Sequence, residues 1–125
     1  MSVVADGQVF PQDLLRITAH RPDGAPALVL EVTGELDLLT APQLEGAFAT
    51  AFADKPDLLV IDLTGVSFMA SLGMTVLLKA QRSAAPSAKV RVVAPEGSVV
   101  ARTLQLTGLL EVLAVAPTVP AALSR

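Results

Sequence analysis

The residue best suited to chemistry in this chain is Ser71, because its hydroxyl is expected at the first turn of a helix. Residues 58–63 have the apolar pattern of a buried strand, and a tight loop should join this strand to a helix that begins at Ser71 and continues to about Ala84. The backbone N–H groups and the dipole at a helix N-terminus favour negative charge, so this position accommodates a phosphate. A simple N-cap is the other role open to the hydroxyl, and the two roles can coexist.

The predicted helix that begins at Ser71 has one polar stripe. At 100° per residue, four side chains share this stripe: Ser71, Thr75, Lys79 and Arg82. Three apolar side chains lie beside or within it: Leu72, Met74 and Leu78. The opposite side should face the sheet, with Gly73, Leu77 and Ala80. An apolar surface with a polar rim is typical of protein docking, and phosphorylation would add about −1.5 to −2 charges to it.

Other combinations of reactive residues are incomplete. Asp62 ends an apolar strand as a Walker B acid does, but the chain has no Gly-x-x-x-x-Gly-Lys-Ser/Thr loop to hold phosphates. His20 is the only histidine, and there is no cysteine to share a metal with it, so we expect it at an exposed strand end. A Gly-x-Ser-x-Gly nucleophile motif is also missing. The sequence therefore predicts a protein that is not an enzyme and has no metal site or cofactor.

Composition and charge limit the class of protein further. The 125 residues are predicted to form one domain, 1–125, with a core of Val, Leu, Ile and Ala, since there is no Trp or Tyr and only four Phe. The lack of cysteine, of a secretory signal and of a membrane-length apolar run predicts a cytoplasmic protein without membrane insertion.

The net charge of −3 is unevenly distributed along the chain. Residues 1–62 hold ten Asp and Glu against three Lys and Arg, whereas residues 63–125 hold two against six. This pattern fits two differently charged faces of a small domain, or a basic surface that docks an acidic partner. Nucleic acid is not an expected partner, because the basic residues are few and no aromatic residues alternate with them.

Two strands and one helix are predicted before the Ser71 segment. Residues 14–20 and 28–33 alternate apolar with polar side chains and should pair as a hairpin across the turn residues 21–26. Residues 34–37 should lead out of the second strand. Thr40 and Gln43 have the spacing of a capping box for a helix over residues 41–53, which should end before Pro56.

Further elements alternate after the Ser71 helix. Residues 89–93 are predicted to form a strand, and residues 98–107 a helix that Ser98 caps and Gly108 ends. Residues 110–115 are predicted as a last short strand, and residues 117–123 as a terminal helical turn. This order predicts an α/β fold with a mixed sheet of four or five strands and helices packed against it.

Three segments in the expected order resemble the STAS domain of bacterial anti-sigma factor antagonists. The first is Gly34-Glu35-Leu36-Asp37 with Thr40-Ala41-Pro42. The second comprises Asp62-Leu63-Thr64-Gly65-Val66, Phe68 and Ala70-Ser71-Leu72-Gly73, and the third is Leu106-Thr107-Gly108-Leu109. The resemblance covers about residues 13–116 and implies a single STAS domain with a mixed sheet of four to five strands.

The resemblance also implies a function and a set of site residues. In that family the unphosphorylated protein binds an anti-sigma factor that is also a serine kinase, phosphorylation ends the interaction, and a phosphatase restores it. The phosphorylatable serine falls on Ser71. The predicted partner-binding residues combine the motif positions Asp37, Ala70 and Leu72 with side chains on or beside the polar stripe of the Ser71 helix, namely Met74, Thr75, Leu78 and Lys79.

This chain departs from the family motif at two positions. Ala70 stands where the family has Asp, and Leu72 where it often has Ser or Thr. Two interpretations agree with these residues. Ser71 is phosphorylated by a kinase matched to the altered site, or the chain is a constitutive binder that has lost the switch. The rival functions are therefore a constitutive STAS subunit of a signalling scaffold or lipid-transport complex, and a nucleotide-binding sensor. Asp37 could contact a nucleotide or partner, or hydrogen-bond to its own loop.

Overall fold

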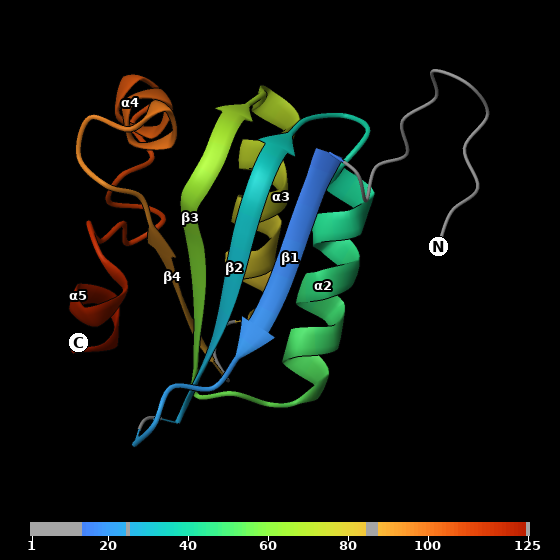
Figure 1. Cartoon of the computed structure of the whole chain (residues 1–125), viewed down its shortest axis with the longest axis vertical. Helices are drawn as coiled ribbons and strands as arrows, with labels where there is room; N and C mark the ends of the chain where they lie inside the picture. The colour runs from blue at the N-terminus through green and yellow to red at the C-terminus, as the bar shows by residue number, and fades with distance from the viewer. Residues whose placement is uncertain (1–13, 25, 85–87, 125) are drawn as a thin grey trace.

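The structure is a computed structural model, and it describes residues 14–24, 26–84 and 88–124. Strands and helices alternate along most of the chain (Figure 1). In chain order the elements are β1 (Leu15–His20), β2 (Ala27–Leu36), α2 (Ala41–Ala53), β3 (Leu58–Met69), α3 (Ser71–Ala84), β4 (Lys89–Val93), α4 (Val99–Leu106) and α5 (Val119–Leu123).

The four strands form one sheet in the order β1-β2-β3-β4. β1 and β2 pair antiparallel as a hairpin, whereas β2 with β3 and β3 with β4 pair parallel. Each parallel pair needs a crossover, and α2 and α3 supply these connections. The predicted α/β fold with a mixed sheet is confirmed, and the sheet has four strands.

The core consists of aliphatic side chains on both faces of the sheet. The larger cluster lies between the sheet and α2, α3 and α4, and it includes Leu30, Ile61, Leu44, Leu77 and Leu104. Alternate residues of the strands point to the opposite face, where α5 covers a smaller cluster of Val29, Val60, Val93, Ala116 and Ala122. β2, β3 and β4 are therefore buried on both faces over part of their length, as parallel strands commonly are.

Two strands are longer than the sequence predicted. β2 continues through Gly34 to Leu36, so the segment 34–36 belongs to the strand and does not lead out of it. β3 continues to Met69, so the tight loop expected after Leu63 is wrong. The ladder between the two strands contains two register shifts, at Glu31/Thr33 and Gly34/Glu35, and at each β3 has one residue more than β2. These β-bulges interrupt the period-2 pattern on which strand prediction depends.

The predicted strand over residues 110–115 is also wrong. These residues form turns, and only the isolated bridge between Val93 and Ala116 extends the sheet within the described residues. The backbone N–H of Leu113 donates to Leu109 O at 3.0 Å, and that of Val115 donates to Leu110 O at 3.0 Å. Leu113 is fully buried, so these turns, and not a strand, bring one apolar side chain of the segment into the core.

Candidate functional site

The site lies where the carboxyl ends of β2 and β3 meet. Because the two strands are parallel, the β2–α2 loop and the start of α3 leave the sheet at the same end (Figure 1). The backbone N–H of Ala70 donates to Leu36 O at 2.8 Å, which fixes the β3–α3 junction beside the end of β2. Asp37 and Ser71, 34 positions apart, each follow a residue of this hydrogen bond.

Hydrogen bonds within the β2–α2 loop determine its shape. Asp37 Oδ1 accepts from the backbone N–H groups of Leu39 at 3.0 Å and Thr40 at 3.2 Å. The Thr40 hydroxyl is fully buried, donates to Glu35 O at 2.7 Å and accepts from Asp37 N–H at 3.0 Å. Of the roles open to Asp37, the structure therefore supports the one in its own loop.

The capping box predicted for α2 does not form. Thr40 occupies the N-cap position, but its side chain makes no capping hydrogen bond to α2. Its hydroxyl is turned back to Glu35 instead, and the Gln43 Nε2 group donates to Leu15 O on β1 at 3.0 Å. Both side chains of the motif are thus used to join α2 to strands rather than to cap the helix.

The predicted helix that begins at Ser71 is confirmed as α3, but Ser71 is not its N-cap. Ala70 O accepts from the N–H groups of Gly73 at 2.9 Å and Met74 at 3.4 Å, which places Ala70 at the N-cap position. Ser71 is exposed, and its hydroxyl makes no hydrogen bond to any other residue that the structure describes. The N-cap interpretation of Ser71 is therefore wrong, and the hydroxyl is open to other partners.

The first turn of α3 lies close to the strand ends because Gly73 has no side chain. A Cβ atom at Gly73 would lie 3.0 Å from Met69 Cγ and 3.1 Å from Leu36 Cβ, closer than most real Cβ contacts. This close approach holds the start of α3, and with it Ser71, at the end of the sheet.

The predicted faces of α3 agree with the observed burial. Ser71, Thr75, Lys79 and Arg82 are exposed, whereas Gly73, Leu77 and Ala80 are buried. Three side chains of the predicted site, Leu72, Met74 and Leu78, are half-buried and pack against the larger core cluster. All three contribute to stability as well as to the surface.

The predicted site residues on α3 are not all equally close to Ser71. The Thr75 hydroxyl donates to Ser71 O at 3.2 Å, one turn along the helix. Lys79 is two turns away, about 12 Å along the helix axis, and its Nζ forms an ion pair with Glu45 Oε2 of α2 at 2.9 Å. The structure therefore brings together Asp37, Ala70, Ser71, Leu72 and Met74, with Thr75 next and Leu78 and Lys79 at the margin.

Exposed apolar side chains around Ser71 were missed in the sequence. Leu38 and Leu39 in the β2–α2 loop are 73% and 61% exposed, Phe68 at the end of β3 is 49% exposed, and Leu106 at the end of α4 is 83% exposed. The Thr107 hydroxyl contacts Met74 Sδ at 3.6 Å, which places the end of α4 beside the first turn of α3. We call Ser71, Met74, Leu38, Leu39, Phe68 and Leu106 the Ser71 surface. Two consecutive leucines in a polar loop were the signal that could have revealed it.

Other candidate residues have local structural roles. His20 is exposed at the end of β1, as expected. Asp62 Oδ1 accepts from the backbone N–H of Thr64 at 3.0 Å and from its hydroxyl at 2.5 Å. Among the residues with described positions, no three His, Cys, Asp or Glu side chains are grouped so that they could hold a metal ion. In the same part of the chain, every helix is too short or too polar to cross a membrane.

The family model for the STAS domain matches residues 16–122, which is most of the chain. The chain belongs to the STAS domain family. Its three motif segments all lie within the matched range, and two of them, at 34–42 and 62–73, form the strand ends and helix start at the Ser71 surface.

This STAS domain is a homologue of anti-sigma factor antagonists. It is 42% identical over 93 residues to the anti-sigma-F factor antagonist RsfB of Mycobacterium tuberculosis, a match that covers 74% of this chain and 75% of RsfB. An anti-sigma factor antagonist from Mycobacterium paratuberculosis has a similar crystal structure, with 34% identity, a TM-score of 0.79, and coverage of 88% of this chain and 92% of that one.

The fold is also shared with a more distant protein. The anti-sigma factor antagonist SpoIIAA in its unphosphorylated form is 22% identical, with a TM-score of 0.63 and coverage of 80% of this STAS domain and 87% of SpoIIAA. At this identity the likeness concerns the fold. Anti-sigma factor antagonists are non-enzymatic STAS proteins.

Proposed function

We propose that this STAS domain is an anti-sigma factor antagonist of the bacterial cytoplasm whose Ser71 surface binds an anti-sigma factor that is also a serine kinase. The unmodified surface binds the partner and thereby frees the sigma factor. Phosphorylation of Ser71 by the partner ends the interaction, and a phosphatase restores it. The 42% identity to a protein named as an anti-sigma-F factor antagonist supports the class of partner.

The observation that carries the proposal is the exposed Ser71 hydroxyl without a hydrogen-bond partner among the described residues. A phosphoryl-transfer reaction needs a hydroxyl that the active site of a kinase can reach, and a capping hydroxyl would first have to leave its own hydrogen bond. Exposed leucines lie on both sides of Ser71, in the β2–α2 loop and at the end of α4. Such apolar side chains give a protein partner area to bury around the reacting group.

The position of the nearest charges on α3 explains how phosphorylation would act as a switch. Lys79 is about 12 Å along α3 and is already paired with Glu45, so it is not placed to neutralise a phosphate on Ser71. The added charge of about −1.5 to −2 would remain on the surface, and docking would require its removal from water. Loss of binding follows from this desolvation cost.

Ala70 and Leu72 determine what kind of kinase fits this site. The Ala70 side chain offers no hydrogen-bonding atom, and Leu72 adds apolar area in place of a hydroxyl. We propose that the partner recognises the apolar side chains of the surface together with the backbone at the start of α3. The proposed contact residues are Asp37, Ala70, Leu72, Met74, Thr75, Leu78 and Lys79, with Leu38, Leu39, Phe68 and Leu106 added from the structure.

The decisive experiment incubates the chain with its anti-sigma factor, Mg²⁺ and ATP and then locates phosphate by mass spectrometry. We expect modification at Ser71 and none in Ser71→Ala. Ser71→Asp should lower the affinity for the partner by at least about tenfold, measured by calorimetry, because a charge replaces the hydroxyl.

Ser83 supplies the matched control, because it is an exposed serine near the other end of α3. Ser83→Asp adds the same charge to the same helix and should leave binding unchanged. An unmodified Ser71 together with unchanged affinity of Ser71→Asp would contradict the switch and favour a constitutive interaction subunit.

A further inference from the structure

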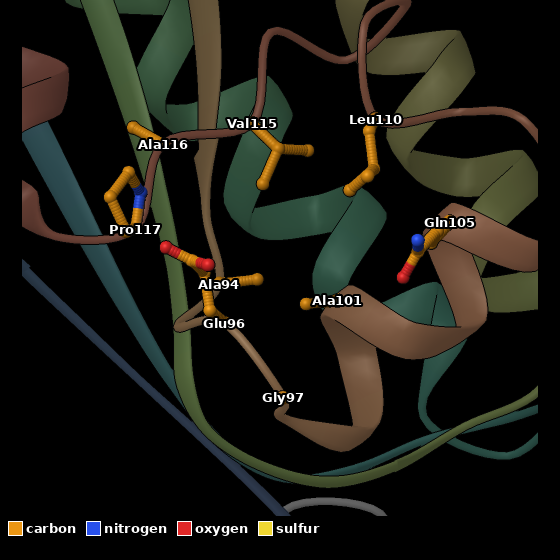
Figure 2. A pocket seen from close by; sticks show the side chains of 9 residues that line it. All are labelled: Ala94, Glu96, Gly97, Ala101, Gln105, Leu110, Val115, Ala116 and Pro117. Carbon is orange, nitrogen blue, oxygen red and sulfur yellow. The ribbon is translucent and has the colours of Figure 1, made fainter.

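A second site candidate lies beyond the carboxyl end of β4, on the side of α4 that carries Ala101 and Gln105. A cavity of about 370 Å³ opens between the end of β4, α4 and the segment 110–117 (Figure 2). Its lining residues are Ala94, Glu96, Gly97, Ala101, Gln105, Leu110, Val115, Ala116 and Pro117. This volume lies in the lower part of the range of about 300–1,000 Å³ that is usual for small-ligand sites.

Backbone hydrogen bonds hold three walls of this cavity in place. Ala116 is attached to the end of β4, because Ala94 N–H donates to Ala116 O at 2.9 Å and Ala116 N–H donates to Val92 O at 2.8 Å. The start of α4 is fixed by Ser98 Oγ, which accepts from Ala101 N–H at 3.1 Å. Val115 N–H donates to Leu110 O at 3.0 Å and closes the turn on the third side. The cavity is therefore formed before any ligand arrives.

The lining combines apolar carbon with two polar side chains. Six of the nine residues are apolar, and Glu96 and Gln105 lie on opposite sides of the cavity in Figure 2. Neither side chain makes a hydrogen bond or ion pair with another residue in the ranges 14–24, 26–84 and 88–124. Glu96 is the only charged residue in the lining, so the potential of the cavity favours a cation.

We infer that this cavity binds a short aliphatic chain that ends in an ammonium or guanidinium group. The chain would cover the apolar side chains of Leu110 and Val115, and the cation would bind the Glu96 carboxylate. The Gln105 amide, on the opposite side of the cavity, is a polar group at the far end of the same site. The inference is independent of the proposed function, because it uses no residue of the Ser71 surface.

Three probes with four carbon atoms each test the assignment: n-butylamine, n-butanol and sodium butyrate. Each is titrated into isotopically labelled full-length protein, and the backbone amide signals of Gly97 and Ala101 are followed by NMR. We expect saturable shifts at both amides, with the tightest binding for butylamine and the weakest for butyrate, and weaker butylamine binding at higher ionic strength.

Glu96→Gln should weaken butylamine binding by about two- to fivefold, the effect of an exposed charge pair, and should leave butanol binding unchanged. Glu111→Gln is the matched control, because Glu111 is an exposed carboxylate next to Leu110 that does not line the cavity. The amide spectrum of each variant reports its fold directly. Equal affinity for butyrate and butylamine, unchanged butylamine affinity in Glu96→Gln, or no shifts at Gly97 and Ala101 would each overturn the inference.

A fourth probe distinguishes a free amine from a protein side chain. N-acetyl-Gly-Lys-Gly-amide carries a four-carbon chain with the same ammonium group on a peptide backbone. If it shifts the same amides, the cation belongs to a lysine of a partner protein. If only butylamine shifts them, the ligand is a small free amine. Both results support the cation site, but they assign the bound cation to different sources.

Discussion

At the scale of single residues, Ala70 is not the residue that its local structure would favour. Its carbonyl group accepts the first hydrogen bonds of α3, so it occupies the position where Asp, Asn, Ser and Thr stabilise helices. A methyl group there leaves the first N–H groups of α3 without a side-chain acceptor. Among the described residues, the N–H groups of Ser71 and Leu72 therefore stay available next to the Ser71 hydroxyl.

Ala70→Asp should raise the free energy of unfolding by about 1 kcal/mol, because the new carboxylate caps α3 and interacts favourably with its dipole. Ala70→Asn, which caps without a charge, should give a similar gain. Unfolding in urea is followed by circular dichroism, since the chain has no Trp or Tyr for fluorescence. Ser83→Asp places a carboxylate near the C-terminal end of the same helix and should not stabilise. A loss of stability in both Ala70 variants would contradict the capping argument.

Residue roles were predictable where the interaction is local. Ser98 caps α4 through Ala101 N–H, and Gly108 has a φ of +75° just after it, both as expected from their spacing. The capping box at Thr40 and Gln43 failed because both side chains found other partners, and the partner of Gln43, Leu15 O, is 28 positions away. Sequence spacing identifies a possible hydrogen bond, but it does not reveal a competing acceptor on another element.

At the scale of elements, Gly34 permits β2 to continue to Leu36. Its φ of +120° is rarely adopted by residues with a side chain. A Cβ atom there would lie 2.0 Å from Leu14 O and 3.0 Å from Leu14 C, well inside van der Waals contact distance. Both are backbone atoms, which cannot turn aside as a flexible side chain can. The hairpin partner of β2 therefore approaches so closely that only glycine fits.

Gly34→Ala should destabilise the protein by at least about 2 kcal/mol, because both the backbone strain and the contact with Leu14 O have to be relieved. Gly46→Ala is the matched control in the exposed middle of α2, where a Cβ atom would meet nothing within 4 Å. This second change should stabilise by about 0.5–1 kcal/mol through helix propensity. Urea midpoints measured by circular dichroism would compare the two, and equal effects of the same sign would refute the explanation.

The order and type of the elements could be predicted more accurately than their lengths. The alternation of patterns correctly gave β1, α2, α3, β4 and α4. The strand predicted for β3 was too short for two reasons. Its second half, from Thr64 to Phe68, contains a glycine and two small polar residues, which are typical of loops. Two bulges also break the alternation of apolar and polar side chains. The segment 110–115 brings Leu113 into the core through tight turns, which periodicity over six residues does not distinguish from a strand.

At the scale of the whole molecule, the apolar side chains that remain exposed are concentrated at one end of the sheet. Four of the six large exposed ones that the described residues contain belong to the Ser71 surface, and they come from β2–α2, β3 and α4. These segments are distant in sequence, so no single window of the chain reveals the surface. The family motif identified its centre at Ser71, and only the fold shows its extent.

Leu38→Ser and Leu106→Ser should each weaken binding to the anti-sigma factor by roughly five- to tenfold, because the buried apolar area on docking is reduced. Their stability should change little, since both side chains are largely exposed. Val112→Ser removes an equally apolar, exposed side chain outside the Ser71 surface and should bind normally. Calorimetric titration measures all three, and an equal loss in Val112→Ser would show that the Ser71 surface is not the docking site.

The two bulges in β3 make this segment sensitive to its length. From Asp62 to Met69 the strand uses eight residues to match the six of β2 from Glu31 to Leu36. Removal of one residue between Asp62 and Met69 would exchange the inward and outward side chains of β3 beyond the deletion. Met69 would then leave the core, and Ser71 would start α3 from a rotated position. Related proteins that use this surface should therefore keep the number of residues between Asp62 and Met69.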